Sequence, residues 1–198
     1  MGKKTLPEML AAALKPETVP GRPVRLCFQD AARFGRIIRF RRGWAPHPLR
    51  PKVCNGYKRQ FTYVYGSVSP LEGQRDWGLS AQMNTPQMNA FLSQVSAAHS
   101  AEFILMVLDG ASAPKSKGLV VPENMPWIRL PADSPELNPQ EPVWDEVREH
   151  AFPNRVSADL EQVVAGVKQE LGALSADGGR VRSLTAWPWI VSLILKVK

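Results

Sequence analysis

The order of strand-like and helix-like segments constrains the fold of this chain more than any other feature. Three segments with strand character come first, followed by a helix, two further strands and two helices. Antiparallel strands at the start and helix-linked strands later predict a mixed five-stranded sheet flanked by helices. We therefore expect one α/β domain.

Apolar and β-branched runs bounded by turn residues mark the strands. A candidate strand "GRIIRF" could pair with the first of them after a turn, and residues 70–73 form a predicted hairpin turn. The five predicted strands are 23–30, 61–69, 74–82, 103–110 and 125–131.

Helical periodicity identifies three segments. In residues 84–98, four apolar side chains recur at the i, i+3, i+4, i+7 spacing of an amphipathic helix, namely Met88, Phe91, Leu92 and Val95. Two more helices are predicted at about 140–151 and 157–174. The second of these should bury Leu160, Val163, Val164, Val167, Leu171 and Leu174.

The two ends of the chain are interpreted differently. Residues 1–22 are weakly patterned, and we expect a tail or the remnant of an interdomain linker, with the domain at 23–198. The apolar segment from Trp187 to Lys198 is shorter than the roughly 20 residues that span a bilayer.

Cys27 and Cys54 form no C-x-x-C, and no secretory signal precedes them. These features predict reduced thiols and a cytoplasmic protein.

Positive charge is concentrated in one part of the chain. The net charge is +7, yet residues 31–71 contain no acidic side chain. Trp44 and Tyr57 lie among the basic residues of this stretch, which suits a phosphate backbone. The alternative is a solvated basic face without a partner. The basic residues are Arg33, Arg36, Arg39, Arg41, Arg42, Arg50, Lys52, Lys58 and Arg59.

Two apolar strands are predicted to end in an aspartate, at Asp30 and Asp109. Ligands of open α/β sheets gather beyond strand ends, which makes both residues candidates for a site. Taken singly, each is also explained as a turn or cap residue.

A proline-rich connection precedes the helix at 140 and presents a third carboxylate. Prolines 131, 135 and 139 restrict the path, so Glu141 should have a fixed direction at the helix start. Carboxylates held together repel unless a cation separates them, and oxygen-only ligands favour Mg²⁺ or Mn²⁺. Two such ions roughly 4 Å apart serve in-line phosphoryl displacement. Asp145 and Glu136 are the rival third ligands.

Several strings of this sequence, taken together, resemble a DDE transposase of the bacterial insertion-sequence branch of the mariner-like superfamily. The resemblance extends over residues 24 to 190, and "SPELNP" followed by Glu141 and Trp144 is its most specific part. It implies a ribonuclease-H-like fold. The strings are "FQDAARFGR", "RRGWAP", "VYGSVSPLEG", "MVLDGASAPKSKGL", "LPADSPELNPQEPVWDEVRE" and "RVRSLTAWPWI".

The resemblance implies a catalytic and metal-binding triad of Asp30, Asp109 and Glu141 with two Mg²⁺ or Mn²⁺ ions. The implied reaction is cleavage of DNA phosphodiesters, followed by attack of a freed 3′-hydroxyl on target DNA. DNA is the implied partner, with a homodimer on paired ends. The implied DNA contacts are Arg33, Arg41, Arg42, Trp44, Lys115 and Lys117.

The chain departs from the family pattern at Ala31, Gly110 and Asp133, where the family commonly has an acidic residue, Asn and Tyr. Only about twenty residues precede the first strand, so we expect this chain to lack the usual N-terminal helix-turn-helix region. We expect a separate helix-turn-helix polypeptide, a truncated relic or an excised domain, and a nucleoid-associated location. The alternative functions are an inactive remnant that only binds DNA and a plain nuclease of the same fold.

Overall fold

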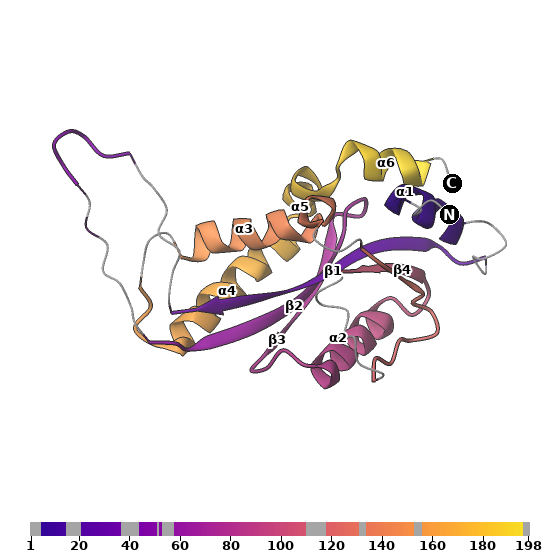
Figure 1. Cartoon of the computed structure of the whole chain (residues 1–198), viewed down its shortest axis with the longest axis horizontal. Helices are drawn as coiled ribbons and strands as arrows, with labels where there is room; N and C mark the ends of the chain where they lie inside the picture. Colours follow the sequence, from indigo (N-terminus) through magenta and orange to yellow (C-terminus); the bar gives the residue numbers. More distant parts are fainter. Residues whose placement is uncertain are drawn as a thin grey trace.

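The fold is built on a mixed sheet of five strands, as predicted (Figure 1). The order across the sheet is β3-β2-β1-β4-β5. β1 pairs antiparallel with β2 and parallel with β4, and β5 continues the parallel half. The strands are β1 (Val24–Gly35), β2 (Phe61–Ser69), β3 (Gln74–Ser80), β4 (Phe103–Leu108) and β5 (Trp127–Arg129).

This computed structural model describes most of the chain. The described residues are 5–14, 21–36, 44–50, 52, 58–109, 118–130, 134–152 and 156–195.

β1 is longer than the sequence indicated. The prediction ended this strand at Asp30, but it continues to Gly35 and stays paired with β2 as far as Phe61. The reason is a second stretch of alternation, in which Ala32 and Phe34 are buried like Phe28 before them. Asp30 therefore lies within a strand, which corrects the interpretation that it ends one. The "GRIIRF" segment falls mostly outside the described residues.

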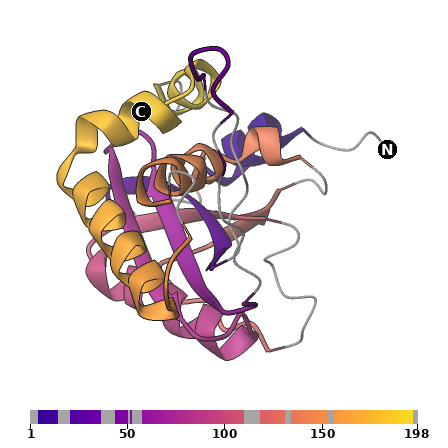
Figure 2. The same ribbon diagram turned by 90° about the vertical axis from the view of Figure 1, so that its left-hand side faces the viewer.

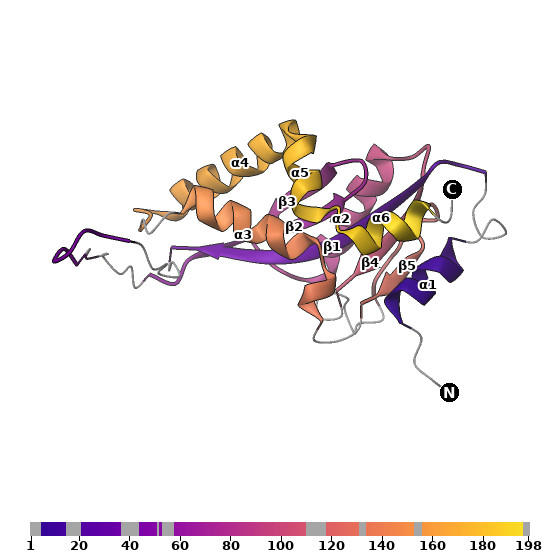
Figure 3. The ribbon, with the colours of Figure 1, turned by 90° about the horizontal axis from the view of Figure 1, so that it is seen from above.

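Helices cover both faces of the sheet. On one face α2 (Thr85–Ala98) buries the four apolar residues predicted for it. On the other face lie α3 (Gln140–Ala151), α4 (Leu160–Ala176), α5 (Gly178–Thr185) and α6 (Pro188–Leu195). Figure 2 shows α4 along one side of the sheet, and Figure 3 shows β1 running beneath α3.

Strand alternation divides the core into two clusters. Leu26 and Phe28 of β1 belong to the larger cluster with α3 and α4, whereas Cys27 belongs to the cluster under α2. Cys27 is buried as a free thiol, as predicted; Cys54 lies outside the described residues. Val163, Val167, Leu171 and Leu174 of α4 are buried as predicted, while Leu160 and Val164 are half-buried. No helix among the described residues is long and apolar enough to cross a membrane.

Near the start of the described residues, a short helix forms that the weak sequence pattern did not reveal. α1 (Leu6–Ala13) begins with a capping box in which Glu8 accepts a hydrogen bond of 2.8 Å from the Thr5 N–H. Its Leu6 and Leu10, together with Leu14, are buried in the larger core cluster. This segment is part of the packed fold rather than a free tail. The domain boundary at residue 22 stays a prediction.

Replacing Leu10 with alanine should lower the free energy of unfolding by about 2–5 kcal/mol, because its side chain is completely buried. Met9 on the same helix is half-buried, so Met9→Ala should cost less than about 1 kcal/mol. Urea denaturation of both variants measures the difference. Equal effects would show that α1 does not contribute to the core as described.

Candidate active site

Strand register brings the two predicted aspartates side by side. The last parallel pair between β1 and β4 joins Gln29 to Leu108, and Asp30 and Asp109 are the next residues of the two chains. Neighbouring strands lie about 4.8 Å apart, and paired residues of parallel strands face the same side. Phe28 and Val107, the pair two residues earlier, both belong to the larger core cluster. Continued alternation directs Asp30 to the face covered by α3, and Asp109 follows directly after the end of β4.

The third element of the site is the first turn of α3. Trp144 is completely buried, and its indole Nε1–H donates a hydrogen bond of 2.9 Å to Oδ2 of Asp30. Glu141 precedes Trp144 by three residues, a spacing that places both on one side of a helix. Glu141 is half-buried, as is Asp109, whereas Asp30 is only 6% exposed.

Asn138 accepts hydrogen bonds from the first backbone N–H groups of α3. Its Oδ1 accepts a hydrogen bond of 3.1 Å from the Gln140 N–H, and its carbonyl accepts one of 3.1 Å from the Glu141 N–H. The side chain of Asn138 is buried at 3% exposure. Sequence reasoning attributed the rigidity to the prolines and missed this residue. Its signal was an asparagine just before the helix, which is a common cap.

The carboxylates of the site influence one another electrostatically. Burial, together with the negative charges of Glu141 and Asp109, raises the pKa of Asp30 to about 6. Hydrogen bonds from the Ala31 backbone and from Trp144 act against this rise. Burial also raises the pKa of Glu141, opposed by the charge of Arg148 and increased by the charges of Asp145 and Asp109. Each of the three carboxylates thus lies within electrostatic reach of the other two.

The donor set suits a hard divalent cation. The acidic residues offer only oxygen ligands, and a cation between them would relieve the repulsion that raises the pKa of Asp30. Within the described part of the chain, no three acidic, histidine or cysteine side chains form a ready-made metal cage. Mg²⁺ is usually held by one or two carboxylates, with water and substrate phosphate completing its shell. Pairs of carboxylates that share Asp30 fit this mode of binding.

The rival third ligands are less suited than Glu141. Asp145 has a side chain that is 68% exposed and lies 3.2 Å from the Arg148 guanidinium. Glu136 is exposed in a 3₁₀ turn (Pro135–Leu137). The acidic neighbours that raise the pKa of Asp30 are Glu141 and Asp109, whereas Asp145 raises the pKa of Glu141. The electrostatics therefore favour Glu141.

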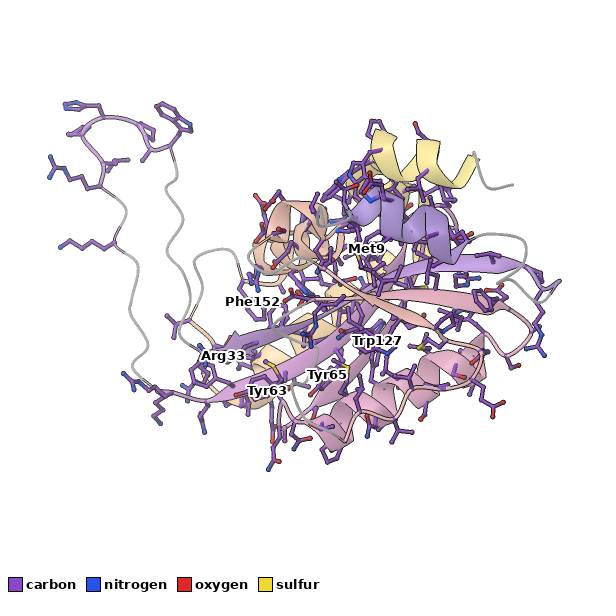
Figure 4. The ribbon with its side chains drawn as sticks, turned by 45° about the vertical axis from the view of Figure 1, so that its right-hand side comes forward. Met9, Arg33, Tyr63, Tyr65, Trp127 and Phe152 are labelled. Atoms are coloured by element: carbon purple, nitrogen blue, oxygen red, sulfur yellow. The ribbon has the colours of Figure 1, made fainter. Side chains whose placement is uncertain are left out.

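The predicted DNA contacts divide into three groups. Arg33 is exposed at the far end of the β1–β2 ribbon, opposite Tyr63 in the strand register (Figure 4). Its guanidinium carbon lies 4.5 Å from the ring centre of Phe61. Strand alternation puts it on the face opposite to Asp30. Trp44 is fully exposed. The remaining predicted contacts lie outside the described residues: Arg41, Arg42, Lys115 and Lys117.

One departure from the family pattern is explained by the fold. Ala31 packs against the α2 cluster, on the opposite face from Asp30, so an acidic residue there would not join Asp30 directly. Gly110 and Asp133 lie outside the described residues.

Comparison with known proteins identifies relatives of this fold and sequence. Residues 25–164 match the family model described as DDE superfamily endonuclease. A protein of Sinorhizobium fredii (strain NBRC 101917 / NGR234), named uncharacterized protein y4pE/y4sA, is 30% identical over 105 residues. That match covers 52% of this chain and 78% of the relative.

Solved structures of the Mos1 transposase share the fold. The Mos1 paired-end complex with the left transposon end has a TM-score of 0.59 at 12% identity, covering 94% of this chain and 60% of that one. The Mos1 mariner paired-end complex with Mn has a TM-score of 0.54 at 14% identity, covering 85% of this chain and 55% of that one. The Mos1 strand transfer complex has a TM-score of 0.56 at 12% identity, covering 94% of this chain and 59% of that one. The present chain thus spans less than two thirds of these transposases. The likeness confirms the predicted ribonuclease-H-like fold.

The raised pKa of Asp30 predicts how stability varies with pH. Because the folded-state pKa is about 6 and the ordinary value is 3.8, the native carboxyl keeps its proton where the unfolded one has lost it. The contribution of Asp30 to the free energy of unfolding is greatest at low pH. It falls by about 3 kcal/mol as the pH rises through about 6. Asp30→Asn should remove this loss, and urea denaturation from pH 4 to 7 measures it.

The exposed Asp145 supplies the control for this experiment. Asp145→Asn should change the free energy of unfolding by less than about 0.5 kcal/mol across the range. A stability difference between Asp30→Asn and the wild type that stays constant with pH would contradict the described burial of Asp30.

Proposed function

Because the chain belongs to the DDE superfamily endonuclease family, we propose that it is a transposase catalytic domain that cleaves DNA and transfers the cut strand. The observation that carries this proposal is the convergence of three elements. Parallel pairing extends to Gln29 and Leu108, the residues just before Asp30 and Asp109, and the hydrogen bond from Trp144 joins α3, the helix of Glu141, to Asp30. The whole-protein activity is a proposal, since the chain spans about three fifths of the Mos1 transposase.

We propose Asp30, Asp109 and Glu141 as the ligands of two Mg²⁺ or Mn²⁺ ions. The all-oxygen donor set and the mutual repulsion of the carboxylates support this choice. Solved Mos1 complexes with Mn and with Mg are further support by analogy. Ions bound in this way would activate the attacking oxygen and stabilise the leaving oxygen of an in-line displacement.

DNA is the proposed substrate, and the basic part of the chain would bind its phosphates. The stretch from residue 31 to 71 contains no acidic residue, and its Arg33 is exposed. Such binding should weaken strongly with salt, because each neutralised phosphate releases counterions. Arg33 faces away from Asp30, so we assign it to DNA passing the end of the β1–β2 ribbon rather than to the scissile phosphate. A homodimer and a helix-turn-helix partner stay predictions.

Asp30→Ala, Asp109→Asn and Glu141→Gln should each reduce Mg²⁺-dependent nicking of plasmid DNA to background, because each removes a proposed ion ligand. Asp145→Asn is the matched control, since it removes a carboxylate from the same helix and should keep nicking near the wild-type rate. Circular dichroism checks that all four variants fold. Cleavage retained by Asp109→Asn would overturn the assignment.

Strand transfer requires a separate assay. The protein is incubated with pre-cut DNA ends carrying free 3′-hydroxyl groups and with a target plasmid, and joined products are counted. Joining would support the transposase function, whereas nicking without joining would leave a hydrolytic nuclease. Salt-sensitive DNA binding with neither reaction would identify a remnant that only binds DNA.

A further inference from the structure

We propose that Trp144 is a positioning residue of this site, whose indole N–H sets the orientation in which the Asp30 carboxylate meets a divalent cation. The inference rests on the proposed function and adds to it a residue outside the carboxylate set. Its experiments are chosen so that failure of the metal site and failure of the role of Trp144 give different results.

The hydrogen bond is placed where it can control orientation. Trp144 and Asp30 are 0% and 6% exposed, so bulk water competes little for the 2.9 Å contact between the indole Nε1–H and Oδ2. The terminal torsion of an aspartate has a broad, nearly two-fold profile and does not fix the carboxylate by itself. An ionised carboxylate offers about four lone-pair positions, so it can accept the indole N–H and still ligate a cation. The indole therefore selects which lone pairs face the other acidic residues.

β2 has a gap in its side chains that accommodates the indole. Gly66 is the register partner of Asp30. A Cβ at this position would lie 2.6 Å from Cη2 and 2.9 Å from Cζ2 of Trp144. The ring thus lies against the backbone of β2, directly beside the strand that carries Asp30. Any larger residue at position 66 would displace the indole.

A second aromatic ring contacts the indole, and a buried amide lies at the same gap beside Gly66. Phe34, four residues after Asp30 on β1, meets Trp144 edge-on with ring centres 6.0 Å apart. The Gln140 amide is fully buried, and its Nε2 lies 3.0 Å from the position a Gly66 Cβ would take. The close approach to Gly66 and the edge contact with Phe34 hold the ring where its N–H meets Asp30.

The same ring determines where Glu141 lies. Glu141 and Trp144 are one helical turn apart on α3, so fixing the indole over Gly66 also fixes the first turn of the helix against β1. Trp144 consequently couples the orientation of the first carboxylate to the position of the third. Outer-shell partners of metal ligands typically change metal affinity 10–100-fold when removed.

Trp144→Phe provides the first test, because phenylalanine keeps an aromatic ring at this position and removes the N–H. Mn²⁺ binding to the whole chain is measured by calorimetry. We expect the dissociation constant to rise about tenfold or more while cooperative unfolding persists. Trp187→Phe is the control: it removes an indole hydrogen bond of 3.1 Å to the Leu184 carbonyl and should leave Mn²⁺ affinity unchanged.

Gly66→Ala provides an independent variant that retains the tryptophan. Its added methyl group should displace the indole and weaken Mn²⁺ binding in the same direction. Mn²⁺ affinity equal to the wild type in both variants would overturn the role of Trp144 while leaving the metal site intact. A wild-type chain that binds no Mn²⁺ would overturn the metal site and this inference together.

Nuclear magnetic resonance gives a readout that does not depend on either variant's stability. The six tryptophans give six indole N–H resonances, and that of Trp144 is assigned by its shift in Asp30→Asn. Paramagnetic Mn²⁺ at the site should broaden this resonance at a lower Mn²⁺ concentration than that of any other tryptophan, because the Trp144 N–H contacts Asp30 directly. A Trp144 resonance that stays sharp when Mn²⁺ is bound would contradict the proposal.

Discussion

The parallel pairing of β1 with β4 is the constraint on which the rest of the site depends. It sets Gln29 opposite Leu108, so the next residue of each chain is an aspartate. A shift of one residue in either strand would send one of the two carboxylates to the α2 face. The apolar alternation of Phe28 and Val107 beneath α3 resists such a shift, because those side chains would leave the core. Core packing therefore fixes the distance between two acidic groups that by themselves repel.

The site combines tight packing with unfavourable electrostatics. Asp30 is buried among apolar side chains and beside two other acidic residues, and its pKa rises to about 6 for both reasons. The hydrogen bonds from Trp144 and the Ala31 backbone offset part of this effect without removing it. A protein selected only for stability would have an apolar residue at position 30. Retained unfavourable charge is a common mark of a functional site, because the missing compensation comes from a ligand.

Much of the fold could be predicted because burial imposes regular periods on the sequence. The period of α2 identified its four buried residues, and five apolar or alternating runs gave the five strands. The extension of β1 past Asp30 was missed because Asp30 resembles a strand end when it is viewed without its partner β2. α1 was missed because a short helix with a proline in its first turn has few periodic positions.

The residues of the site likewise fall into those that the sequence could predict and those that it could not. Asp30, Asp109 and Glu141 were chosen as carboxylates at ends of elements, a signal that a single sequence contains. Asn138, Gly66 and the direction of the Trp144 indole are not encoded locally. They depend on which residue of β2 lies opposite Asp30 and on how α3 packs over it. Arg33 looked like a neighbour of the site in sequence, but strand alternation puts it on the other face.

The most direct test of the central claim is anomalous X-ray diffraction from crystals of the chain soaked in Mn²⁺. We predict Mn²⁺ held by the carboxylates of Asp30, Asp109 and Glu141, with the Trp144 indole still hydrogen-bonded to Asp30. Mn²⁺ bound only at other carboxylates, or Glu141 turned away while Asp145 ligates the ion, would contradict it.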